Sequence, residues 1–170
     1  MYHISNDLRA KKSAEKIYRS LRHILFNKSI EHITITDIKN ECGVSRATFY
    51  RLFDNVIDVL EMKMDYFILL YKKDLLQSQD HISTFYNFWN NHNDFIYILS
   101  KQQEHILKKL FIKHFYQTSY NKLDLYLFEV QISVMTGLLS KWVERGKQES
   151  VDEMIKITKQ ILNNTSNLLL

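Results

Sequence analysis

The chain has 170 residues, no proline, three glycines and one cysteine, which excludes an internal disulfide framework and leaves few signals that interrupt helices. About 70% of the unfolded surface can be buried at this length, so one domain, or a small module packed on a larger one, is expected. The net charge of +4 is unevenly placed, because residues 1–52 carry ten Lys and Arg against five Asp and Glu, and residues 53–170 carry thirteen against fourteen.

Strand-like alternation is absent over any long window, which predicts an all-α protein of about nine helices. No apolar run approaches the ~18 residues of a membrane span. The N-terminal sequence M-Y-H-I-S-N-D lacks the apolar core of a secretion signal, and a lone cysteine fits a reducing compartment. We therefore expect a cytoplasmic protein without a membrane partner.

The first predicted helix covers residues 8–28, with its apolar residues on one stripe and most of its lysines and arginines outside it. The basic excess of residues 1–52 is what a phosphate-binding face needs. An excess of this size is also found on ordinary solvated surfaces, so charge alone does not identify a partner.

Residues 34–53 predict two short helices joined by a tight turn. Thr34 can cap the first helix, with Asp37 three residues later completing a start that resembles a capping box. Gly43 ends that helix, because only glycine enters the left-handed conformation without steric cost. Ser45 is placed to cap the second helix.

The second of these helices divides into two faces. Phe49 and Phe53 are expected to point inward, with Ala47 close to the first helix. Arg46, Thr48, Tyr50 and Arg51 are left on the outside. A short helix held by its predecessor, with arginines and hydroxyls outward, is typical of a helix-turn-helix that enters the major groove of DNA. The alternative is a helical hairpin with ordinary caps.

The pattern Thr34-x-x-Asp37-Ile38-x-x-x-Cys42-Gly43-Val44-Ser45-x-x-Thr48-x-Tyr50-x-x-Phe53 resembles the DNA-binding signature of the TetR/AcrR family of transcriptional regulators. The resemblance implies a helix-turn-helix domain at residues 1–54 and a helical body at residues 55–170 that senses a ligand and dimerises. It implies contacts with double-stranded DNA from Thr34, Lys39, Ser45, Arg46, Thr48, Tyr50 and Arg51. The chain departs from the family at Leu52, often a polar residue there, and at Val56, commonly a lysine.

The body is predicted to begin with a fourth helix, capped by Asp54 or Asn55 and running to about Leu76. Polar residues 77–83 follow as a linker, whose Ser83 can cap the next helix. Three further helices are expected in the aromatic segments 85–89, 95–99 and 110–116, with breaks near 90–93 and 100–103. Their aromatic side chains can be an ordinary core or the lining of an effector pocket, and the resemblance favours a pocket. The candidates are Phe85, Phe88, Trp89, Tyr97, Phe111 and Phe115.

Two long helices complete the prediction. The first spans residues 122–145 and ends at Gly146, and the second starts at the capping box formed by Ser150 and Glu153. Residues 163–170 are expected to fray or to add minor packing. Apolar residues on more than one side leave a face for a partner subunit, and the resemblance implies a homodimer. The candidate interface residues are Leu127, Val130, Val134, Leu138, Trp142, Ile157 and Ile161.

The segment W-V-E-R-G-K-Q-E-S at residues 142–150 also resembles the C-terminal part of regulators related to the dihydroxyacetone-kinase activator. Catalytic motifs are absent from the sequence: it has no Gly-rich phosphate loop, no nucleophile elbow and no H-E-x-x-H pair. No enzyme activity, metal or cofactor is therefore expected.

The resemblance implies a regulator that binds a palindromic operator as a homodimer, most relatives being repressors that a small-molecule effector releases. The alternative is an adaptor or coactivator of the same fold that acts through a protein partner with little DNA binding of its own. The departures at Leu52 and Val56 are the reason for keeping it open.

Overall fold

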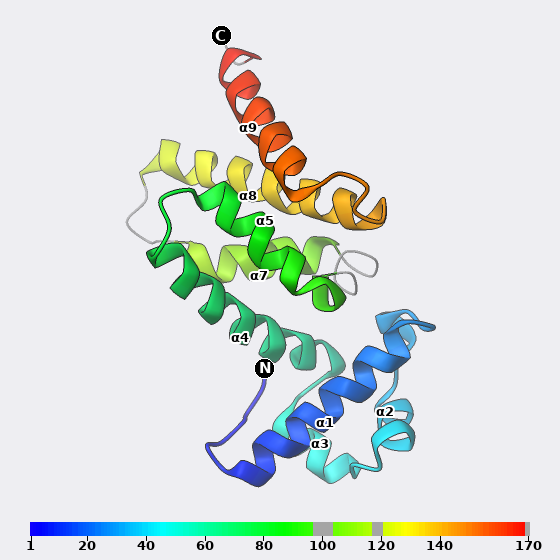
Figure 1. Ribbon diagram of the computed structural model, residues 1–170. Coiled ribbons are helices and arrows are strands. Elements are labelled where there is room, and N and C mark those ends of the chain that lie inside the picture. Colours follow the sequence, from blue (N-terminus) through cyan, green and yellow to red (C-terminus); the bar gives the residue numbers. More distant parts are fainter. Residues whose placement is uncertain (97–103, 117–120, 169–170) are drawn as a thin grey trace. The chain divides into compact units, whose positions relative to one another are not determined.

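The computed structural model describes residues 1–96, 104–116 and 121–168, and gives the backbone alone at 104–107 and 165–168. Regular secondary structure in these residues is helical, apart from an isolated antiparallel bridge between Tyr2 and Phe53. The predicted all-α class is confirmed for this part of the chain (Figure 1). The chain forms two compact units, and the boundary between them, Phe67 and Ile68, falls within one helix.

The first unit is built on one long helix and two short ones. It contains α1 (Leu8–Leu25), a 3-10 turn η1 (Ile30–His32), α2 (Ile35–Cys42), α3 (Arg46–Leu52) and the start of α4 (Val56–Leu76). α1 packs against both α2 and α3. It ends at Leu25 rather than at the expected residue 28, because the chain turns there into η1.

Apolar side chains at helical spacing form the core of the first unit. α1 contributes Ala10, Ala14, Ile17, Leu21 and Leu25, α2 contributes Ile38 and Cys42, α3 and the residue after it contribute Phe49, Leu52 and Phe53, and α4 contributes Val59, Leu60 and Met64. Leu52 is only 2% exposed. Leu52, where the resemblance leads one to expect a polar residue, is therefore part of this core.

Of the two residues predicted to cap α4, Asp54 and Asn55, the structure shows Asn55 in that role. Its side-chain oxygen accepts a hydrogen bond from the backbone N–H of Asp58 at 3.1 Å. The buried carboxylate of Asp58 accepts in return from the N–H groups of Asp54 and Asn55, at 2.9 and 3.0 Å. This reciprocal cap fixes the direction in which α4 leaves α3.

The second unit contains the rest of α4, α5 (His81–Asn91), α7 (Glu104–Phe115), α8 (Lys122–Glu144) and α9 (Val151–Leu168). α5 packs on α9, α7 packs on α8, and α8 contacts α9. Residues 93–96 are also helical. The predicted break at 90–93 falls at His92, which ends α5; the break near 100–103 lies outside the described residues.

Three expectations for the second unit need correction. The cap of α5 is Asp80, whose carboxylate accepts from the N–H of Ser83 at 3.0 Å, so Ser83 lies inside the helix. Asp80 also accepts from Lys159 at 2.9 Å, which ties the start of α5 to α9. α9 continues as helix to Leu168, so of the two alternatives for the tail, fraying or minor packing, fraying from residue 163 is not observed. Trp142, a candidate for the dimer interface, is 2% exposed and donates to the carbonyl oxygen of Glu149 within its own subunit.

Candidate DNA-binding and ligand-binding sites

Three local features fix the start of α2, the turn after it and the start of α3. At the start of α2, the backbone N–H of Thr34 donates to Asp37 at 2.7 Å and the N–H of Asp37 donates to the Thr34 hydroxyl at 3.2 Å. Gly43 has a φ of 70°, the left-handed conformation that ends α2. The Ser45 hydroxyl caps α3 by accepting from the N–H of Thr48 at 3.1 Å. The predicted capping box, glycine turn and serine cap are all confirmed.

An ion pair strengthens the first of these caps. The ammonium group of Lys28 lies 2.7 Å from the carboxylate of Asp37. Lys28, followed by the backbone N–H and hydroxyl of Thr34, lowers the pKa of Asp37 to about 2. Asp37 is thus ionised at neutral pH, as a carboxylate at a helix N-terminus should be.

α3 has one buried and one exposed face. Phe49 and Leu52 are buried, whereas Arg46, Tyr50 and Arg51 are exposed and Thr48 is half-buried. Tyr50 is 57% exposed, an unusual state for a tyrosine in a helix of seven residues. Ala47, expected close to the first helix of this pair, α2, is exposed as well.

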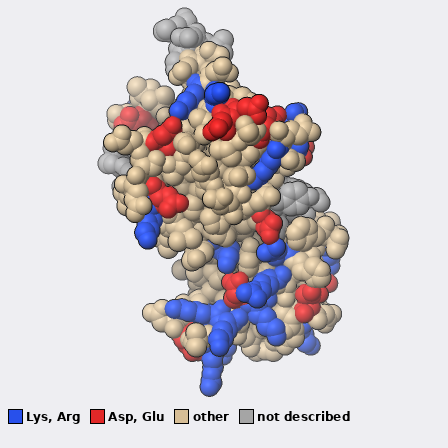
Figure 2. Space-filling model, viewed as in Figure 1, with Lys and Arg blue, Asp and Glu red and all other residues tan. Residues whose placement is uncertain are grey.

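Some of the residues predicted to contact DNA already form side-chain hydrogen bonds within the protein, and others do not. The hydroxyls of Thr34 and Ser45 form the caps, and a guanidinium nitrogen of Arg46 donates to the hydroxyl of Thr36 on α2. Lys39 and Arg51 are exposed and make no hydrogen bond or ion pair with a described residue. Lysine and arginine side chains gather over α1 and α3 on the face shown in Figure 2.

The N-terminal segment also supports α3, a role that the sequence did not reveal. The backbone N–H of His3 donates to the carbonyl oxygen of Leu52 at 2.8 Å, at the end of α3. The hydroxyl of Tyr2 donates to Asp65 of α4 at 2.6 Å. Burial and the hydrogen bond to Asp65 raise the pKa of Tyr2, so its hydroxyl keeps its proton. The segment connects the end of α3 to α4 through contacts far apart in sequence.

A cavity of about 480 Å³ lies within the second unit. Its wall includes three of the predicted ligand-binding residues, Phe85, Phe111 and Phe115, together with Tyr71 and Met135. None of the described residues that line it is Asp, Glu, Lys or Arg. Burial raises the pKa of Tyr71, so its hydroxyl keeps its proton. The polar side chains of the wall also include His81, Gln131 and Thr136.

The remaining predicted ligand-binding residues lie elsewhere. Trp89 is fully buried in the aromatic core, in contact with the rings of Tyr71 and Phe111. Phe88 lines a separate, polar groove. Tyr97 falls outside the described residues. Phe85 and Trp89 share one face of α5, so position along the helix separates them: Phe85 borders the cavity, and Trp89, one turn later, lies in the packed interior.

One face of α8 is apolar and exposed. Leu123, Tyr126, Leu127 and Val130 follow each other at helical spacing, with Leu127 49% and Val130 47% exposed. By length and composition α8 is the one described helix that could cross a membrane, and 17% of that stretch is buried. Core helices of soluble proteins meet the same two criteria. Exposure of this kind is common where a second subunit packs.

Among the residues whose side chains are described, no group of three His, Cys, Asp or Glu is placed to hold a metal ion. No protein-family model matches the chain, and no curated protein matches it in sequence.

Solved structures share its fold at low sequence identity. The crystal structure of Lin0861 from Listeria innocua matches with a TM-score of 0.70 and 15% identity, covering 99% of this chain and 96% of that one. The fatty acid degradation regulator FadR from Bacillus halodurans matches with a TM-score of 0.56 and 14% identity, covering 88% and 94%. The chain therefore shares its helical fold with these two proteins.

Proposed function

We propose that this chain is a TetR-like transcriptional regulator whose α3 enters the major groove of DNA. The observation that carries the proposal is the division of α3, which is capped at Ser45, anchored by buried Phe49 and Leu52, and exposed at Arg46, Tyr50 and Arg51. Two arginines and a tyrosine on the exposed face supply hydrogen-bond donors of the kind that contact phosphates and base edges. The resemblance of residues 34–53 to the TetR/AcrR signature points the same way.

Each exposed residue has a role suited to its chemistry. Arg46 is assigned to base edges, where a guanidinium forms two hydrogen bonds with guanine. Tyr50 donates to a phosphate, Thr48 contacts a thymine methyl group or a phosphate, and Arg51 and Lys39 add positive charge. A regulator of this kind would act in the cytoplasm, where its DNA lies.

The cavity of about 480 Å³ in the second unit is the proposed effector site. Its volume suits a small molecule, and its aromatic and aliphatic lining favours one that is largely apolar. We assign repression as the basal activity and release by the effector as the response. The effector must then bind the two conformations with different affinity, because equal binding shifts no equilibrium.

A homodimer follows from the exposed apolar face of α8. Two copies of the Leu127–Val130 face would cover each other, with Val134, Leu138, Ile157 and Ile161 extending the contact. Two-fold symmetry then requires a palindromic operator, with half-sites about 34–36 Å or a multiple apart.

An adaptor that acts through a protein partner is the second candidate. It is favoured by the first turn of α4, where half-buried Val56 offers no charge to a phosphate. The variants Arg46→Ala and Tyr50→Phe separate the two functions. Under the regulator function both weaken operator binding while the protein stays folded and dimeric, and unchanged activity in both variants favours the adaptor.

A further inference from the structure

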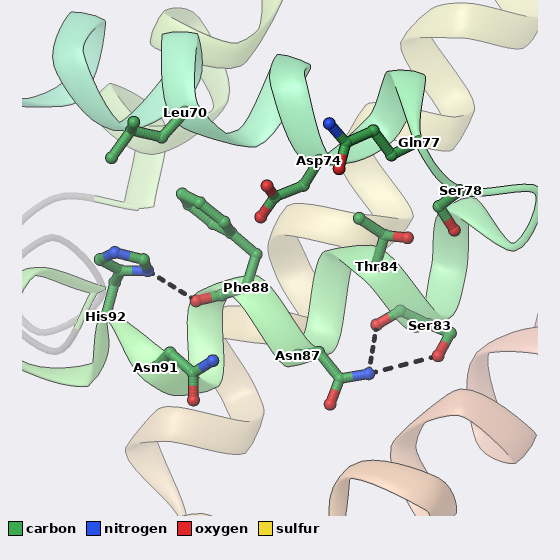
Figure 3. Close-up of a pocket in the computed structure, with 10 residues that line it drawn as sticks. All are labelled: Leu70, Asp74, Gln77, Ser78, Ser83, Thr84, Asn87, Phe88, Asn91 and His92. Carbon is green, nitrogen blue, oxygen red and sulfur yellow. Dashed lines mark hydrogen bonds between the residues drawn. The ribbon is translucent and has the colours of Figure 1, made fainter.

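A second hollow in the second unit has a chemistry unlike that of the effector cavity. It is an open groove of about 570 Å³ between residues 70–78, at the end of α4, and residues 83–92 of α5 (Figure 3). Positions 83, 87 and 91 form one row along α5, and positions 84, 88 and 92 form the next row. The groove is about 13 Å long at 1.5 Å per residue. We call it the polar groove.

Most hydrogen-bond donors of the polar groove are used within the protein. The hydroxyl of Thr84 donates to the carbonyl oxygen of Asp80 at 2.9 Å, and the amide of Asn87 donates to that of Ser83 at 3.0 Å. Nδ1 of His92 lies 2.7 Å from the carbonyl oxygen of Phe88 and must donate, because a carbonyl can only accept.

These bonds leave both acceptors and amide groups toward the groove. The side-chain oxygen of Asn87 and the lone pairs of the Thr84 hydroxyl are acceptors, and Gln77 and Asn91 each contribute a donor group and an acceptor. A ligand that fits this surface therefore carries hydroxyl groups, which both donate and accept.

Asp74 gives the polar groove its charge. Its side chain extends from α4 toward α5 in Figure 3. It forms no ion pair or side-chain hydrogen bond with a described residue, and no lysine or arginine is among the described residues that line the groove. One uncompensated carboxylate repels anions and attracts a single cation.

We propose that the polar groove binds a small polyhydroxylated amine, an amino sugar or linear amino polyol. The protonated amine pairs with Asp74, the hydroxyls donate to the acceptors along α5, and the carbon chain lies against Leu70 and Phe88. The proposal does not depend on DNA binding, and the ligand differs in kind from the apolar effector of the cavity.

The test uses two probes that differ in one group. D-glucamine and D-sorbitol are the same linear chain, except that an amine in the first replaces a terminal hydroxyl in the second. Amide resonances of the labelled full-length protein are followed by NMR as each probe is added. We expect D-glucamine to shift residues 74–78 and 83–92 in a saturable way, with D-sorbitol about two- to fivefold weaker.

Variants then assign the preference to the carboxylate. Asp74→Asn should bring D-glucamine down to the affinity of D-sorbitol. Asp152→Asn, which neutralises an exposed carboxylate on α9, should leave the difference intact. Equal affinity for the two probes, preference that survives in Asp74→Asn, or no saturable shift with either probe would each overturn the proposal.

Discussion

The ammonium group of Lys72, on α4, lies 2.7 Å from the carbonyl oxygen of His114, in the last turn of α7. The same group lies 5.1 Å from the ring centre of Phe115. Carbonyls in a last helical turn have no partner within the helix, so Lys72 satisfies one of them with a charged donor. Phe115 lines the cavity of the second unit, as Tyr71 of α4 does, so the contact joins α4 and α7 at the wall of the proposed effector site.

Replacing Lys72 by methionine should weaken this link. The variant keeps most of the aliphatic chain but loses the hydrogen bond and the cation–π contact, at a cost of about 1–2 kcal/mol in the free energy of unfolding. Amide hydrogen exchange at the end of α7 should also become faster. Lys73→Met is the matched control, since Lys73 is exposed and makes no such contact with a described residue. Equal losses in both variants would contradict the assignment.

The hydroxyls of Tyr86 and Thr158 lie 2.6 Å apart in the core and join α5 to α9. Thr158→Val should cost more than Tyr86→Phe, by about 1 kcal/mol, since it leaves the tyrosine hydroxyl buried without a partner. The threonine hydroxyl has a substitute, the carbonyl oxygen four residues earlier in its own helix. Urea unfolding of both variants and of the double variant measures the coupling, and additive losses would show that the bond contributes nothing.

Asp37 should make the first unit sensitive to acid. Its pKa lies near 2 in the folded protein, below the ordinary 3.8, so its contribution is complete above pH 3.8 and is lost as the pH falls toward about 2. Asp37→Asn should therefore be less stable than the parent at neutral pH, and the difference should shrink across that interval. Urea unfolding at a series of pH values checks this. A difference that is constant with pH would rule out the Lys28–Asp37 pair as its source.

The apolar face of α8 should decide the oligomeric state. A glutamate at Val130 would be buried among apolar groups in a dimer, which should raise the dissociation constant at least about tenfold. Sedimentation velocity over a range of concentrations measures this change. Leu76→Glu is the control, because Leu76 is 89% exposed and lies on another helix. A dimer that tolerates the glutamate at position 130 would place the interface elsewhere.

Sequence reasoning succeeded where the deciding contacts are local. The Thr34–Asp37 and Ser150–Glu153 capping boxes join residues three apart, and the turn at Gly43 depends on one residue. Such signals need no knowledge of the tertiary structure.

It failed where a contact joins distant parts of the chain. Tyr2 bonds to Asp65, 63 positions away, and Asp80 to Lys159, 79 positions away. No local sequence pattern predicts either pair. The position of Trp142 was missed for a related reason. A helix with apolar residues on several sides does not reveal which side its own core will cover.

The measurement that tests the central claim most directly is binding of the purified protein to DNA from beside its own gene, at several salt concentrations. The account predicts tight, sequence-selective binding with two subunits per site and a steep fall in affinity with salt. Arg51→Ala should reduce the salt slope by about 1, and Arg46→Ala should reduce the preference for the operator over unrelated DNA. Weak binding that is equal on every DNA and unaffected by either variant would contradict the account.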